Sequence, residues 1–208
     1  GCGGIVTNVS WRDDYLRSPP AWQRLREVVA YCRTQGIRVW LYDENTFPSG
    51  GAGGRVLDGH PEFEAQCLAD TGNPSDRFRV MPAFEHTPAA NMGHYVRRCA
   101  NIMDDRAMSR FVDVTYGAYA RELGELLTHV EAFFTDEPSL LAFHSKTDPA
   151  RFHNSDIVID KPDPAAPCLP CVPWVNDLPA RYQERHGQDL MSCLPSLFGG
   201  DTAMDREV

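Results

Sequence analysis

Hydrophobic and polar positions predict a strand, a helix and a second strand in the first 44 residues. Residues 3–10 are apolar enough for a first strand, and residues 37–42 form a run of β-branched and aromatic side chains between a glycine and two acids. Ser18 precedes two prolines and suits a helix start, whereas Gly36 suits a helix end. Apolar residues recur between them at helical spacing, at Trp22, Leu25, Val29 and Cys32. Strands joined in this way are expected to be parallel.

The same alternation returns later in the chain. A helix is predicted from Asp104, and residues 130–135 read as a second buried strand. The helix presents one apolar stripe, made of Met108, Phe111, Thr115, Tyr119, Leu123 and Leu126. Residues 65–100 have poor periodicity and are predicted to be an insertion, and a long loop is expected from residue 139 to about 173. Asn176 and Asp177 then precede a further helix that Gly187 ends.

Both predicted strands end in the dipeptide Asp-Glu. Asp43 and Glu44 follow the first, before a loop rich in proline and glycine at residues 48–54, and Asp136 and Glu137 follow the second. Active sites of parallel α/β proteins form at such carboxyl ends. Because side chains alternate along a strand, the two glutamates are predicted to point inward and the two aspartates to lie behind them.

This pattern predicts an α/β fold, specifically a partial (β/α)8 barrel of the TIM type with a small insertion and long rim loops. The 208 residues are fewer than the ~250 of a complete barrel, so we expect residues 1–208 to be a fragment of a single catalytic domain. The remainder of its own barrel and accessory domains are then expected partners. An open barrel leaves strand edges uncovered.

Charge and hydropathy narrow the classes of ligand. The formal net charge of -9 argues against a nucleic-acid partner, because such binding needs a basic surface. No apolar run approaches the ~20 residues that cross a bilayer, so no membrane partner is expected and the chain should be soluble. The composition leaves the cellular compartment open.

Cysteines and histidines give weaker signals. The pair Cys168 and Cys171 forms a CxxC motif, which is more simply a loop with two thiols than half of a zinc site or a redox pair. His144 and His153 flank Asp148 in the long loop, at a spacing that specifies no metal. No metal ligand is assigned on these patterns.

Two carboxylates at neighbouring strand ends are what glycoside hydrolysis requires. One protonates the departing oxygen while the other attacks the anomeric carbon or activates a water. Glu137 and Glu44 are the predicted catalytic pair. The predicted contacts to an oligosaccharide or glycoside substrate are Asn8, Trp11, Asp43, Ser49, Gly50, Asp136 and Trp174.

Two other classes of function stay open. A noncatalytic carbohydrate-binding protein would keep the same rim without the chemistry. A metal-dependent hydrolase would use Asp43, Asp136 and His144. The acid pairs alone do not separate these classes.

A family resemblance rests on three stretches: V-W-L-Y-D-E-N-T-F-P-S-G-G-A-G-G at residues 39–54, A-F-F-T-D-E-P-S-L at 132–140, and P-W-V-N-D-L-P-A-R-Y-Q-E-R-H-G-Q-D-L at 173–190. They resemble the barrel of bacterial glycoside hydrolases of the α-L-rhamnosidase family 106 type. The resemblance implies that Glu137 and Glu44 sit in the catalytic centre. It also implies inverting chemistry, calcium as a cofactor, and α-L-rhamnosides of plant or microbial glycans as substrates.

Overall fold

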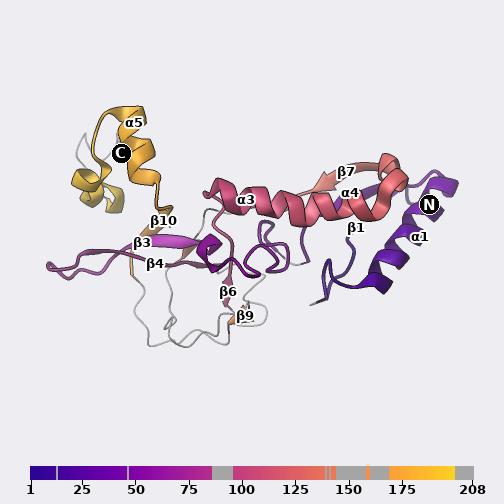
Figure 1. The fold of residues 1–208 in the computed structure, drawn as a ribbon, viewed down its shortest axis with the longest axis horizontal. Helices are drawn as coiled ribbons and strands as arrows, with labels where there is room; N and C mark the ends of the chain where they lie inside the picture. Colours follow the sequence, from indigo (N-terminus) through magenta and orange to yellow (C-terminus); the bar gives the residue numbers. More distant parts are fainter. Residues whose placement is uncertain are drawn as a thin grey trace. The chain divides into compact units, whose positions relative to one another are not determined.

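The computed structural model describes residues 1–12, 14–45, 47–85, 96–138, 140, 142–143, 158–159 and 169–199. The chain forms two compact units. Unit 1 comprises Gly1–Phe63 and Asp105–Ser139, and unit 2 comprises Glu64–Asp104 and Leu140–Val208. Figure 1 shows the elements of each unit. Both acid pairs predicted from the sequence belong to unit 1.

Unit 1 is built on a three-stranded parallel sheet with the strand order β1-β2-β7. Its strands are β1 (Gly4–Thr7), β2 (Arg38–Tyr42) and β7 (Val130–Phe134). Ile5 lies opposite Val39 in the register, and Leu41 lies opposite Phe133. The two predicted strands that end in Asp-Glu are therefore neighbours in one sheet, which confirms their predicted pairing.

Helix α1 (Pro19–Gln35) connects β1 to β2, and its ends follow from local chemistry. The Ser18 hydroxyl accepts a hydrogen bond from the Ala21 N–H, and prolines occupy the first turn, where an N–H is not needed. Gly36 adopts a left-handed conformation with φ of 65° and donates its N–H to carbonyls of the last turn. The predicted start and end of this helix are confirmed.

The second connection leads into β7 through a helix that changes its winding. Its first three segments run as one rod (Figure 1), which ends at Gly124, with φ of 52° and ψ of -124°. Its segments are α3 (Asp105–Val112), the π-helical turn η2 (Asp113–Gly117), α4 (Ala118–Leu123) and the 3-10 turn η3 (Gly124–His129). A π turn holds one residue more than an α turn, so it shifts which side chains face the sheet. The sequence predicted one regular helix here.

The sheet of unit 1 has two different faces. One face, called the covered face, carries Val39 and Leu41, which are fully buried. Tyr119 of α4 lies under the sheet, where its hydroxyl accepts from the Val9 N–H at 3.1 Å and donates to the Tyr42 carbonyl at 3.2 Å. The open face carries Val6, Trp40 and Phe134, which are exposed at 55%, 42% and 39%. Burial on one face alone is the pattern of a sheet with a single helical layer.

Unit 2 contains antiparallel sheets. One has the order β10-β3-β4, with β3 (Gln66–Asp70), β4 (Phe78–Pro82) and β10 (Cys171–Trp174). Its core cluster consists of Leu68, Trp174, Leu190 and Leu194. The second sheet has the order β8-β5-β6-β9, with β5 (Phe84–Glu85), β6 (Val96–Arg98), β8 (Ala142–Phe143) and β9 (Val158–Ile159). The short η1 (Pro61–Phe63) belongs to the end of the first segment of unit 1, and α5 (Leu178–His186) and η5 (Leu190–Phe198) belong to unit 2.

The prediction of a partial (β/α)8 barrel with a small insertion is wrong. In the described part of the chain the parallel sheet has three strands, and the other strands pair antiparallel in separate small sheets. The fold is a small mixed α/β structure. The stretch predicted to be a rim insertion, residues 65–100, carries β3 and β4 instead, and Leu68 of β3 packs with Trp174, Leu190 and Leu194 in a core of unit 2. The pairing of β3 with the distant β10 is a nonlocal contact that no local pattern encodes.

None of the helices formed by the described residues is long and apolar enough to cross a membrane.

Tyr119→Phe should destabilise the fold, because it leaves the buried Val9 N–H and Tyr42 carbonyl without this partner. We expect a loss of about 1–3 kcal/mol in the free energy of unfolding. Tyr31→Phe is the matched control, since Tyr31 is exposed on α1. Urea unfolding followed by circular dichroism would measure both variants. Equal stability of Tyr119→Phe and the wild-type chain would contradict the bridging role of this hydroxyl.

Candidate functional site

A buried carboxylate stands at the carboxyl ends of β2 and β7. Asp43 is fully buried, and its Oδ1 accepts a hydrogen bond from the Ser49 hydroxyl at 2.5 Å. Its Oδ2 accepts from the hydroxyls of Tyr116 and Thr135, both at 2.6 Å. We call these four residues the Asp43 cluster. A buried charge is expensive unless hydrogen bonds replace its hydration, and three hydroxyl donors do so here.

Ser49 joins the glycine-rich loop to the end of β7. Its hydroxyl accepts from the Asp136 N–H at 2.9 Å, and its own N–H donates to the Asp136 carbonyl at 2.9 Å. The Asp43 N–H also donates to the Phe134 carbonyl, at 3.2 Å. The main chain on both sides of Asp136 is thereby fixed to the loop that follows β2.

Glu44 lies inside the glycine-rich loop and is fully buried. Its Oε1 accepts from the N–H groups of Asn45, at 2.9 Å, and Gly53, while Oε2 accepts from the Gly51 N–H at 3.0 Å. A carboxylate bound by several backbone N–H groups organises a loop around itself. In the structure this side chain stabilises the loop. The predicted catalytic role of Glu44 stays a prediction.

Glu137 differs from Glu44 in exposure and in backbone. Its side chain is exposed, and its φ of 38° lies in the left-handed region that residues other than glycine rarely adopt. Pro138 follows it and restricts the chain further. The structure therefore presents Glu137 to solvent on a strained backbone, directly after the fixed residue Asp136, which is half-buried.

Three other predicted contacts also belong to unit 1. The Asn8 side-chain amide donates to the Glu44 carbonyl at 2.7 Å, so this buried residue braces the end of β2. Trp11 is 60% exposed and its ring lies against Tyr42, with 5.5 Å between centroids. Gly50 is buried with a φ of 135°, which favours glycine at that position.

Trp174 belongs to unit 2, in the core with Leu68 and Leu190. It is buried, and its carbonyl accepts from the Asn101 side chain at 2.8 Å. The structure thus places this predicted sugar contact inside a hydrophobic core of unit 2.

Tyr116 and Thr135 are the members of the Asp43 cluster that the sequence analysis did not assign to the site. Thr135 stands one residue before the acid pair, so its position was a usable signal. Tyr116 lies in the π turn η2, and its place depends on the irregular winding there. Burial, together with the Asp43 carboxylate, raises the pKa of Tyr116 to about 12.

Metal-binding side chains do not cluster in the part of the chain that the structure describes, where no three His, Cys, Asp or Glu side chains come together to hold a metal ion. The calcium that the family resemblance implies has no group of three carboxylates there. His144, Asp148, His153 and Cys168 lie outside the described residues, whereas Cys171 opens β10.

Comparison of the chain with models of known protein families, with curated proteins and with solved structures gave no match.

Raising the pH should destabilise the fold through Tyr116. An unfolded tyrosine ionises near pH 10, whereas the folded Tyr116 keeps its proton to about pH 12, so the unfolded chain releases its proton first. This contribution is complete below pH 10 and declines as the pH rises towards 12. Tyr116→Phe should show a shallower decline, measured by urea unfolding at several pH values. Identical pH profiles for the two proteins would contradict this assignment.

Ser49→Ala removes the hydroxyl that donates to Asp43 and accepts from the Asp136 N–H. The buried carboxylate and the N–H each lose a partner, so the free energy of unfolding should fall by about 2–3 kcal/mol. Ser109→Ala on the exposed side of α3 should change it by less than about 0.5 kcal/mol. Thermal unfolding of both variants checks this prediction. A loss no larger than that of the control would mean that Ser49 does not join the loop to β7.

Proposed function

We propose that unit 1 carries the site of a glycoside hydrolase and that Glu137 is the carboxylate that acts on the substrate. The observation that carries the proposal is the exposed Glu137 on a backbone with φ of 38°, at the end of a parallel strand and directly after a residue fixed on both sides. Backbone strain of this kind clusters at functional sites. The family resemblance supports the same residue independently.

The strain at Glu137 has a structural source. Holding a non-glycine residue in this region costs about 1–3 kcal/mol and persists only where the surroundings fix it. Here Ser49 binds both the N–H and the carbonyl of Asp136. Pro138 favours an extended conformation for Glu137 and therefore adds to the strain at φ of 38°. The Asp43 cluster therefore holds the carboxylate-bearing segment in a conformation that it would not keep alone.

Glycoside cleavage needs a second group beside Glu137. One carboxyl protonates the departing oxygen while the other attacks the anomeric carbon or activates a water. Glu44 already accepts three backbone N–H hydrogen bonds, so in this proposal it shapes the loop and transfers no proton. Asp136, half-buried at the same strand end, is the second carboxylate of the proposal.

The surroundings suit a neutral, polyhydroxylated substrate. The chain has a net charge of -9, which disfavours anionic ligands. Trp11 offers an exposed aromatic ring against Tyr42, and such rings stack on the apolar faces of sugars. The proposed substrate class is a glycoside, with α-L-rhamnosides taken from the resemblance.

A noncatalytic carbohydrate-binding protein is the second candidate. The observation that favours it is the burial of Glu44 among backbone donors, because this removes one of the two carboxylates that the sequence predicted for catalysis. Such a protein would use the same loop and the same exposed Trp11 to bind glycans without cleaving them.

Glu137→Gln should abolish turnover of 4-nitrophenyl α-L-rhamnopyranoside by the full chain. Loss of a catalytic carboxylate should lower kcat by roughly a thousandfold or more, while stability should hardly change because Glu137 is exposed. Glu125→Gln, an exposed glutamate in η3, is the matched control and should keep full activity.

Unchanged turnover by Glu137→Gln would remove this residue from catalysis. If the wild-type chain and the variant both bind the glycoside without releasing nitrophenol, the second candidate is correct. Calorimetric titration of the same two proteins with methyl α-L-rhamnopyranoside separates these results.

A further inference from the structure

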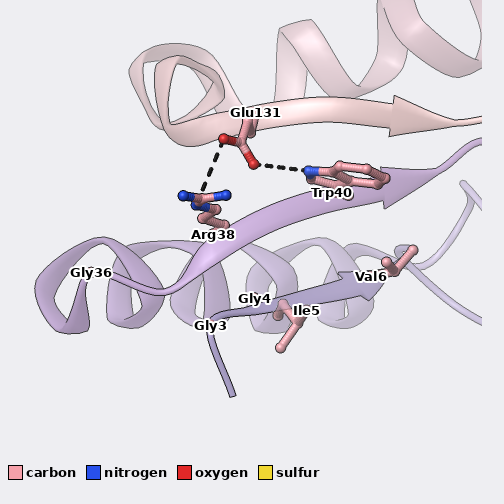
Figure 2. Close-up of a pocket in the computed structure, with 8 residues that line it drawn as sticks. All are labelled: Gly3, Gly4, Ile5, Val6, Gly36, Arg38, Trp40 and Glu131. Carbon is pink, nitrogen blue, oxygen red and sulfur yellow. Dashed lines mark hydrogen bonds and ion pairs between the residues drawn. The ribbon is translucent and has the colours of Figure 1, made fainter. Parts of the chain in front are cut away.

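A pocket of about 690 Å³ opens on unit 1 near the amino ends of β1, β2 and β7. Figure 2 shows that Arg38, Trp40 and Glu131 gather around it from two neighbouring strands. The rest of its lining comes from β1, the glycine before it and Gly36. Pockets of roughly 300–1,000 Å³ hold small-molecule ligands.

The aromatic wall of the pocket is held in one orientation. The Trp40 indole N–H donates to Glu131 Oε2 at 3.0 Å, and Glu131 Oε1 lies 3.8 Å from Arg38 Nε. Trp40 nevertheless remains 42% exposed. The indole thus has its polar atom bound while ring surface stays accessible, which is the state of an aromatic platform ready to stack on a ligand.

Glycines keep the opposite side of the pocket free of side chains. A Cβ on Gly4 would lie 3.2 Å from both the Cβ and the carbonyl oxygen of Arg38, so glycine allows β1 to approach β2 closely. A Cβ on Gly3 would meet nothing within 4 Å. The room beside Arg38 therefore depends on glycine at position 4, where a side chain would meet β2.

The charges of the pocket favour a neutral ligand. Arg38 and Glu131 form one pair of opposite sign, so the two charges among the lining residues cancel. A carboxylate accepts hydrogen bonds from hydroxyl groups, and a guanidinium donates to them. An aromatic face beside one such donor and one such acceptor matches a pyranose, which has an apolar C–H face and a rim of hydroxyls.

We propose that this pocket is a saccharide-binding site in which a pyranose stacks on Trp40 and its hydroxyls reach Glu131 and Arg38. Its lining on β2 and β7 comes from the amino-terminal parts of these strands and includes neither Asp136 nor Glu137, which follow the carboxyl end of β7. The choice of a sugar over other neutral polar ligands rests on the proposed function, whereas the pocket itself does not. The site would hold a glycan without contacting the bond that is cleaved.

The indole N–H signals of ¹⁵N-tryptophan-labelled protein test the proposal. The Trp40 signal is assigned as the indole signal that disappears from the spectrum of the Trp40→Ala variant. Titration with methyl α-L-rhamnopyranoside and with methyl β-D-galactopyranoside should shift that signal in a saturable way with at least one sugar. The Trp22 and Trp174 signals should stay in place, because those rings are buried. The shift should persist in Glu137→Gln, which separates this site from the proposed catalysis.

Arg38→Gln is the second variant, since it removes the guanidinium proposed to bind the sugar hydroxyls and keeps Trp40 as the reporter. It should weaken the sugar-dependent shift at least tenfold while circular dichroism remains unchanged. Arg17→Gln, exposed and outside the pocket lining, is the matched control and should bind as the wild type does.

Three results would overturn the proposal. The first is a Trp40 signal that neither sugar moves, even if the chain hydrolyses aryl glycosides. The second is a signal that moves with inorganic phosphate alone, which would indicate an anion site. The third is a signal that moves with protein concentration alone, which would indicate a second copy of the chain on the open face. Conversely, a sugar-dependent shift in a chain that hydrolyses no glycoside would support this site and refute the proposed catalysis.

Discussion

Unit 1 depends on the hydrogen bonds that one buried carboxylate accepts. Asp43 is fully removed from water, and the three hydroxyls around it supply the hydrogen bonds that water would otherwise give its carboxylate. Those hydroxyls come from three separate elements: the glycine-rich loop, the helix before β7 and the end of β7 itself. The Asp43 carboxylate thereby fixes the relative positions of three segments that are distant in sequence. The position of the exposed Glu137 depends on these segments.

Local chemistry made part of unit 1 predictable. Ser18 and Gly36 mark the ends of α1, and the two Asp-Glu pairs mark the ends of neighbouring parallel strands, because caps and strand ends are written in a few adjacent residues. The orientation of Glu44 was not predictable by strand alternation, since β2 ends at Tyr42 and the chain then turns into the loop. The barrel prediction assumed that the strand-helix alternation of unit 1 continues through the rest of the chain. This assumption fails at β3, which pairs antiparallel with β10.

The two glutamates at corresponding strand ends illustrate how a symmetric sequence pattern becomes asymmetric in space. Glu44 is followed by a glycine-rich loop whose N–H groups wrap around its carboxylate, whereas Glu137 is followed by a proline, which has no N–H to offer. The carboxylate of Glu44 is therefore buried and hydrogen-bonded within the loop, whereas that of Glu137 is exposed to solvent. The identity of the residues that follow decides between these outcomes.

The π turn at Asp113–Gly117 sets the angular phase of the whole helix before β7. One additional residue in that turn lets Tyr119 pack against Phe133 of β7 while Tyr116 reaches Asp43 and Phe111, before the turn, is also buried. A regular α-helix advances about 100° per residue, so the same residues without the extra one would be out of phase with the sheet on one side of the turn. The number of residues in η2 is therefore constrained as strictly as their identity.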